Sequence, residues 1–121
     1  MSRQKGAQAE EVACAFLRKN GFEILERNFF ARYGEIDIIA RKDEVLHFIE
    51  VKSGVGFEPI YNITPSKLVK LHKAIGLYIS THHIAQAYCL DALIIKDGQC
   101  EMIENISFTL SIYLLFYVFD F

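Results

Sequence analysis

Four charged side chains alternate with apolar ones in two neighbouring segments. Glu35 and Asp37 lie in GEIDIIA, and Glu50 and Lys52 lie in HFIEVK. If both segments are strands, residues two apart share a face, so each segment presents its charged pair on one side of the sheet. A hairpin turn that is symmetric about Asp43-Glu44, in the polar stretch 41–44, then places Asp37 opposite Glu50 and Glu35 opposite Lys52.

The apposition of Asp37 and Glu50 has chemical meaning. Two carboxylates directly opposite one another, with Cβ atoms about 5 Å apart, repel and destabilise a bare sheet. A bound Mg²⁺ or Mn²⁺ reverses that penalty, because hard cations take oxygen ligands and keep several waters. Lys52 beside such a cation could orient, or help to deprotonate, a water that attacks phosphorus. The pattern is therefore suited to metal-dependent hydrolysis at phosphorus.

An ordinary amphipathic hairpin has the same pattern. Alternating charged strands are common on solvated faces, where Glu35 would simply form a cross-strand ion pair with Lys52 or pair with Arg41. The apolar neighbours Ile36 and Ile38 are expected to turn together to the opposite face. Spacing alone leaves both a metal site and a solvated face open.

Helices and strands alternate in a mixed order around this hairpin. Residues 3–20 carry apolar positions at helical spacing and end on an Asn-Gly pair, which is typical of a helix C-cap. FEILERNFF has the pattern of a strand, and the Thr-Pro pair at 64–65 predicts the start of a second helix. AYCLDALII and CEMIENI have the pattern of two strands joined by an Asp-Gly turn. This order predicts an α/β fold with a central mixed sheet flanked by helices.

Composition indicates one compact domain without a strong overall charge. A chain of 121 residues, 52% of them hydrophobic, can bury one core without disulfide or metal staples and has no room for a second domain. A net charge of −2 excludes a broad basic field for non-specific binding to nucleic acid. Lys67, Lys70 and Lys73 form the clustered basic patch, which is either a nucleic-acid contact or a solvated helix face.

The cysteines and histidines show no motif of their own. Cys14, Cys89 and Cys100 lack C-x-x-C spacing and follow an N-terminus without an apolar leader, so reduced cysteines in a cytoplasmic protein are expected. The four histidines, including His47, have no zinc-like spacing with one another or with a cysteine. They are interpreted as surface or helix-end residues, and a zinc site is not expected.

The C-terminal segment ISFTLSIYLLFYVF at 106–119 carries no charge. Its length falls short of the roughly 17 to 25 residues that span a bilayer, so a membrane span is not the favoured interpretation. An apolar segment in water must be covered. We therefore expect a domain at 1–108 and an apolar tail at 109–121 that packs on the domain or on a second copy, as in a homodimer. An extension unrelated to the chemistry of the domain is the alternative.

The motifs together resemble a known family. Gly6-x-x-x-Glu10, FLRKNGFEILERN, GEIDIIA, FIEVK, a lysine-bearing helix from Thr64 and a late LDALII follow in that order over most of the chain. They resemble the YraN-like uncharacterised bacterial proteins, which are grouped with the PD-(D/E)XK nuclease superfamily and are similar to archaeal Holliday-junction resolvases. The resemblance implies a restriction-endonuclease-like three-layer core and Mg²⁺-dependent endonuclease activity on DNA, including branched or structured DNA.

The resemblance also implies roles for individual residues. Asp37 matches the first metal carboxylate of the superfamily, Glu50 the second, and Lys52 the lysine of the E-x-K element. Glu10 matches the helix-borne glutamate, which we expect either to point across the sheet as a third ligand or to remain a solvated helix acid. The implied cofactor is Mg²⁺ or Mn²⁺.

Two positions depart from the family pattern. Gly54 and Cys89 stand where the family commonly has arginines that could touch phosphate. Their loss makes Lys67, Lys70 and Lys73 the expected phosphate contacts. It also leaves open a second function, in which the nuclease fold binds nucleic acid or protein with weak catalysis or none.

Overall fold

Two helices enclose a five-stranded mixed sheet in the computed structural model, which describes residues 3–32, 34–54 and 63–106. The strands lie in the order β1-β2-β3-β4-β5, and the β3 and β4 pair is parallel. The elements are α1 (Arg3–Lys19), β1 (Glu23–Ala31), β2 (Gly34–Lys42), β3 (Val45–Gly54), α2 (Pro65–Thr81), β4 (Tyr88–Lys96) and β5 (Gln99–Ile103). The predicted order of elements and the α/β class are confirmed.

The apolar tail lies outside the described residues. Its expected boundary at 108 and its covering by the domain or a second copy therefore stay predictions. Among the described residues, no helix combines the length and apolar character needed to cross a membrane.

Both helices begin or end at the caps that the sequence predicts. After α1 the chain turns at Gly21, whose φ of 88° suits glycine, and Phe22 N donates to Leu17 O at 3.0 Å. At the start of α2, Thr64 Oγ1 accepts a hydrogen bond from Lys67 N at 3.3 Å. These local signals set the direction in which each helix crosses the sheet.

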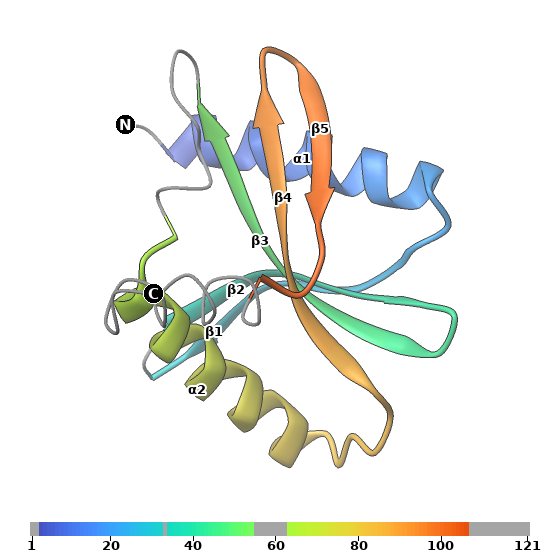
Figure 1. Cartoon of the computed structure of the whole chain (residues 1–121), viewed down its shortest axis with the longest axis vertical. Coiled ribbons are helices and arrows are strands. Elements are labelled where there is room, and N and C mark those ends of the chain that lie inside the picture. Colours follow the sequence, from blue (N-terminus) through green and yellow to red (C-terminus); the bar gives the residue numbers. More distant parts are fainter. Residues whose placement is uncertain (1–2, 33, 55–62, 107–121) are drawn as a thin grey trace, which may run out of the picture.

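Each helix covers one face of the sheet, which gives three layers (Figure 1). The α1 side buries apolar residues from the helix against three strands: Ala13, Leu17, Ile38, Ile49 and Leu93. The α2 side buries a second set: Leu71, Ile75, Ile36, Phe48, Ala92 and Ile94. The two faces are therefore both desolvated, as the restriction-endonuclease-like architecture requires, and a charged group on β2 or β3 must find its own partner.

The hairpin register is the predicted one from the turn as far as Ile38. β2 and β3 pair from Lys42 with Val45 to Ile38 with Ile49. At the next position the ladder ends, and the carboxylate Oδ2 of Asp37 accepts the N–H of Val51 at 2.8 Å. The Asp37 side chain thus takes over a hydrogen bond that a neighbouring strand would otherwise make.

The strands change face at the same level. Ile36 packs in the α2-side core and Ile38 in the α1-side core, so the expectation that they turn together is wrong. On the adjacent strand, Asn28 lies between the residues paired with Ile38 and Ile36, and it has a φ of 54°. Asparagine tolerates this left-handed conformation. The local kink interrupts the alternation and leaves Asp37 at the point where the sheet switches faces.

The interpretation of His47 as a surface or helix-end residue is wrong. Its side chain is buried, with Nδ1 2.5 Å from Oδ2 of the fully buried Asp91. A strand position can hold a buried imidazole when the neighbouring strand supplies a carboxylate, and sequence spacing does not reveal that partner. His82 does lie at a helix end, where its Nδ1 is 3.0 Å from Tyr78 O. The three cysteines are free, as predicted.

The packing of α1 can be tested with two matched leucine variants. Leu17→Ala, at a fully buried position of α1, should lower the free energy of unfolding by about 2 to 5 kcal/mol, because a cavity remains beneath the helix. Leu77→Ala on α2, where the leucine is 46% exposed, should change it by about 0.5 kcal/mol. Urea unfolding measures both values. Equal losses would contradict the placement of α1 on the sheet.

Candidate functional site

Three carboxylates converge where β2 leaves its partner. One oxygen from each of Glu10, Glu35 and Asp37 lies within 4.8 Å of the other two. Glu10 comes from α1, and its side chain is 15% exposed, so it is not a solvated helix acid. Tertiary packing therefore brings the helix-borne glutamate to the predicted hairpin.

The position of Glu10 follows from the buried stripe of its helix. It precedes Ala13 by one turn and Leu17 by two, and both of these residues are fully buried against the sheet. Arg27 on β1 holds the neighbouring Glu11 at 2.7 Å, while its closest approach to Glu10 is 3.9 Å. As a result, the buried Oε1 of Glu10 has no hydrogen-bond partner. A buried oxygen without a donor is an acceptor that a cation could satisfy.

Asp37 is the most strongly perturbed member of the cluster. Burial, followed by the negative charges of Glu50, Glu10 and Glu35, raises the pKa of Asp37 to about 7, although the N–H of Val51 opposes the shift. Burial and the charge of Glu10 also raise the pKa of Glu35. Neighbouring acids that resist ionisation together need either a proton or a cation among them.

Glu50 lies beside this cluster without being one of its three converging members. Burial raises the pKa of Glu50, while the positive charge of Lys52 works in the opposite direction. Lys52 Nζ is 3.4 Å from Glu50 Oε1. Lys52 therefore pairs with Glu50, and the alternative pairing with Glu35 is not what the structure has.

The converging set thus differs from the predicted ligand set in one member. Asp37 and Glu10 belong to both sets, Glu35 converges with them, and Glu50 lies beside the three. Strand alternation placed Glu35 on the same face as Asp37, and this was the sequence feature that could have identified it as a member of the site. The sequence pattern instead favoured an ion pair of Glu35 with Lys52 or Arg41. Arg41 instead contacts Glu23 on β1.

Two of the three predicted lysines border the site. Lys67 and Lys70 line a small hollow of about 160 Å³ with Glu35 and Glu50. A hydrogen bond with the neighbouring Lys52, burial and the charge of that lysine together lower the pKa of Lys67. Lys73 does not line this hollow. Lys67 and Lys70 therefore place positive charge on one side of the carboxylates.

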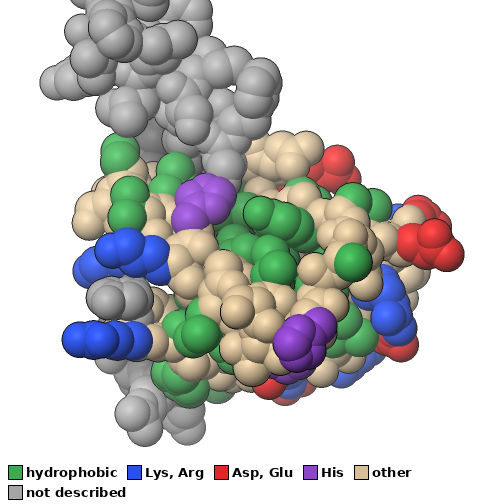
Figure 2. Space-filling view, turned by 90° about the horizontal axis from the view of Figure 1, so that it is seen from below, with side chains coloured by type: hydrophobic (Ala, Val, Ile, Leu, Met, Phe, Trp, Pro, Cys, Tyr) green, Lys and Arg blue, Asp and Glu red, His purple; other side chains and the backbone are tan. Residues whose placement is uncertain are grey.

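Basic side chains do not form a continuous surface on the face that Figure 2 shows. Hydrophobic side chains lie at its centre, lysine or arginine side chains lie at both the left and the right edge, and the acidic ones lie mainly toward the right and lower edges. This agrees with the small net negative charge of the chain. Contact with a polyanion must rely on local lysines rather than on a broad field.

The donor set of the cluster fits a hard divalent cation. Its ligands are all carboxylate oxygens, which Mg²⁺ and Mn²⁺ prefer over the nitrogen and sulfur donors that attract softer metals. The unpartnered Oε1 of Glu10 and the raised pKa of Asp37 are both features that a cation would relieve. Glu10, Glu35, Asp37 and the adjacent Glu50 are the residues that could hold it.

The crowding of carboxylates around Asp37 predicts that Asp37→Asn changes the stability of the metal-free protein in a pH-dependent way. Between about pH 4 and pH 7 the folded protein keeps a proton on Asp37 that the unfolded chain has released, so stability falls as pH rises through this window. The substituted amide would remove that penalty, while its carbonyl still accepts the N–H of Val51. Thermal unfolding in EDTA should show the variant gaining on wild type across this range, by at most about 4 kcal/mol.

The matched control is Asp97→Asn, in the exposed turn between β4 and β5. This variant should show no pH-dependent gain in stability over wild type. A loss of stability in Asp37→Asn that is the same at every pH would contradict the crowding of carboxylates at Asp37.

Comparison with known proteins shows the family to which the chain belongs. The model of "Uncharacterised protein family UPF0102" matches residues 9–95, which contain all the acidic residues of the cluster. A UPF0102 protein of Helicobacter hepaticus is 77% identical over 106 residues, covering 88% of this chain and 96% of its own length.

More distant relatives carry the same family name. A UPF0102 protein of Helicobacter pylori (strain P12) is 59% identical and covers 88% of this chain and 93% of its own length. One of Wolinella succinogenes is 55% identical over 107 residues, with 88% and 99% covered. These matches confirm the YraN-like resemblance, and the chain belongs to the UPF0102 family of uncharacterised proteins.

Proposed function

We propose that the protein is a divalent-cation-dependent endonuclease that hydrolyses phosphodiester bonds in DNA. The observation that carries the proposal is the convergence of Glu10, Glu35 and Asp37 next to Glu50 and Lys52. Side chains from one helix and two strands meet here, in the order of residue types that the nuclease superfamily uses. A solvated hairpin face would not bury a glutamate from α1 among these acids.

Asp37, Glu10 and Glu50 are the proposed metal ligands, and Glu35 joins them as a candidate because it converges with Asp37 and Glu10. Bound Mg²⁺ or Mn²⁺ would supply Lewis-acid stabilisation of charge on phosphate oxygens and lower the pKa of a water. Asp37 is held in place by the N–H of Val51, so its free oxygen has a defined direction. Such fixed contacts are what precise positioning at a reacting centre needs.

Lys52 is the proposed partner of the attacking water. Its Nζ is held beside Glu50 Oε1, and its side chain is 19% exposed, so it is shielded from bulk water yet reachable by substrate. From this position Lys52 can orient a water toward phosphorus and take part in removing its proton. Lys67 and Lys70, which line the small hollow with Glu35 and Glu50, are the proposed contacts to phosphates on either side of the bond.

The substrate class follows from the limited extent of positive charge. A chain with a net charge of −2 and few lysines at the site gains little from long contacts along a duplex. Branched or structured DNA brings several phosphates together at one place, which suits a local cluster of lysines. We therefore propose such DNA as the preferred substrate.

A panel of linear, single-stranded, flapped and four-way-junction DNA with Mg²⁺ or Mn²⁺ tests the activity. Asp37→Asn should reduce the cleavage rate by at least about 100-fold, because stabilisation worth several kcal/mol is lost with the cation. Lys52→Gln should slow cleavage by about 10²- to 10⁴-fold while metal binding, followed by calorimetry, remains. Asp97→Asn is the matched control and should cleave as wild type does.

Cleavage that survives in Asp37→Asn would mean that a contaminating nuclease or another site is responsible. Binding of the same DNA panel without turnover by the wild-type protein would instead assign the alternative function, a nucleic-acid-binding module on the nuclease fold. Loss of the family's arginines at the positions of Gly54 and Cys89 is the feature of this sequence that favours that alternative.

Phosphate contacts by the α2 lysines can be measured apart from cleavage. The double variant Lys67→Gln/Lys70→Gln should weaken DNA binding and flatten the plot of log affinity against log salt by about 0.9 for each contact removed. Fluorescence anisotropy in Ca²⁺, to avoid turnover, gives both quantities. Lys19→Gln, at the exposed end of α1, is the control. An unchanged salt slope in the double variant would show that Lys67 and Lys70 do not contact phosphates.

A further inference from the structure

We propose that His47, Cys89 and Asp91 form a second metal site, which takes zinc and is independent of the proposed nuclease centre. The parallel pairing of β3 and β4 sets His47 directly beside Cys89. Asp91 follows two residues later on β4, so all three side chains share the α1 face of the sheet. The residues are far apart in the sequence, which is why their spacing gave no zinc signal.

The three donor atoms already lie close to a zinc geometry. Cys89 Sγ is 3.1 Å from His47 Nδ1 and 3.4 Å from Asp91 Oδ2. In a tetrahedral zinc site, bond lengths of about 2.0 to 2.3 Å put such ligand atoms about 3.4 to 3.6 Å apart. Both sulfur distances need to open by no more than about 0.5 Å to reach that range. The remaining pair, His47 and Asp91, lies at hydrogen-bond distance and would open further when zinc replaces the shared proton.

The donor types select a softer metal than the carboxylate cluster does. One sulfur, one imidazole nitrogen and one carboxylate oxygen form a set that zinc commonly uses. Mg²⁺ prefers oxygen ligands alone and has no use for the thiolate. The chain thus holds two clusters with different chemical preferences, at different levels of β3.

Neighbouring residues hold the cluster in place. Asn105 N donates to Asp91 Oδ1 at 2.9 Å, which leaves Oδ2 to face His47 and Cys89. The Phe22 ring lies edge-on to the imidazole with centroids 5.0 Å apart. Outer contacts of this kind orient metal ligands and are part of a working site.

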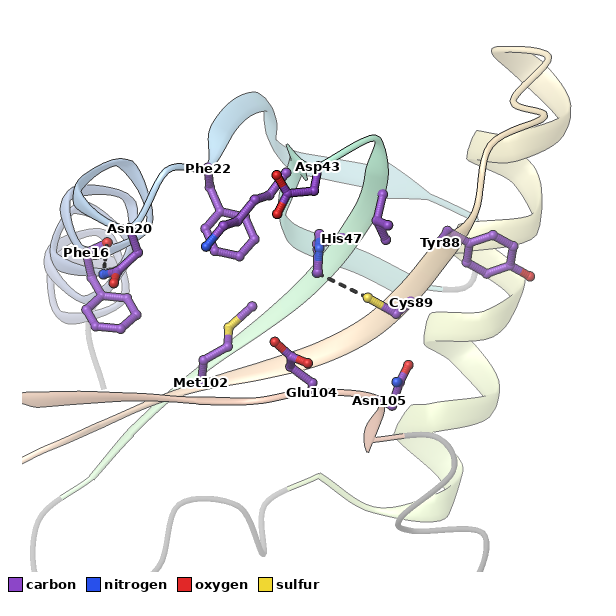
Figure 3. Close-up of a pocket in the computed structure, with 12 residues that line it drawn as sticks. Phe16, Asn20, Phe22, Asp43, His47, Tyr88, Cys89, Met102, Glu104 and Asn105 are labelled. Carbon is purple, nitrogen blue, oxygen red and sulfur yellow. Dashed lines mark hydrogen bonds between the residues drawn. The ribbon is translucent and has the colours of Figure 1, made fainter.

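The cluster opens into a hollow of about 550 Å³, so a metal ion has a path to it. Figure 3 shows His47 and Cys89 in contact, with Glu104 and Asn105 from the segment after β5 lining the same hollow. A carboxylate or a water in this space can fill the fourth position that three protein ligands leave open. Zinc here would join β3 and β4.

A cysteine nucleophile is the competing explanation, and the geometry disfavours it. In a nucleophilic triad the histidine uses one ring nitrogen for the nucleophile and the other for the acid. Here Cys89 and Asp91 both contact Nδ1 of His47. Burial and the charge of Asp91 also raise the pKa of Cys89 to about 12, so the metal-free thiol is not an activated nucleophile.

Titration of the full chain, stripped with EDTA, by Zn²⁺ and by Co²⁺ tests the site. We expect one tight zinc per chain, a rise in melting temperature with zinc, and a thiolate-to-cobalt charge-transfer band in the near ultraviolet. Cys89→Ser and His47→Gln should remove the band or weaken zinc binding at least about 10-fold. The control Cys100→Ser, which changes a partly buried cysteine on β5, should retain both.

Two further variants keep the outcome decisive. Cys14→Ala/Cys100→Ser leaves Cys89 as the single cysteine and should keep the band, even if Cys89→Ser fails to fold. Asp37→Asn should also keep it, which separates this site from the proposed nuclease centre. A wild-type protein without a thiolate band, or a band and zinc affinity that persist in folded Cys89→Ser, would overturn the proposal.

Discussion

Negative charge is crowded at the place where β2 parts from β3. Asp37 sits at the kink where the strand changes faces, within reach of Glu10 from one layer and of Glu50 from beside it. Burial prevents water from screening these charges, so the folded protein must keep a proton there or bind a cation. The α1-side core keeps Glu10 close to the other acids, because moving this part of the helix away would unpack Ala13 and Leu17 from the sheet.

β3 contributes residues to two chemically different clusters, one near the start of the strand and one near its end. Near its start, His47 faces α1 beside Cys89 and Asp91. Near its end, Glu50 and Lys52 lie with the carboxylate cluster and with lysines of α2. A central strand covered on both faces is the stiffest element of such a sheet, so groups placed on it are held with little freedom. That rigidity suits metal ligands, which need fixed positions more than they need strong individual contacts.

Charge in this protein is local rather than global. The chain is slightly acidic overall, yet Lys52, Lys67 and Lys70 stand together beside the acids. The charges of Lys52 and Lys67 lower the cost of ionising Glu50, and Lys52 resists further positive charge at Lys67. The acids and lysines are therefore one coupled system, in which a phosphate and a cation would each replace a contact that the metal-free protein makes with itself.

Local signals in the sequence determined the order of elements, the caps at Gly21 and Thr64, and the hairpin register from Ile38 onward, because turns, caps and strand alternation act over a few residues. They also marked Asp37, Glu50 and Lys52 as a candidate site. Only the tertiary structure decided that Ile36 faces α2, that Glu35 joins the acidic cluster, and that His47 is buried against Asp91. These outcomes depend on a strand kink and on contacts between residues distant in the chain, where burial and packing outweigh local pattern.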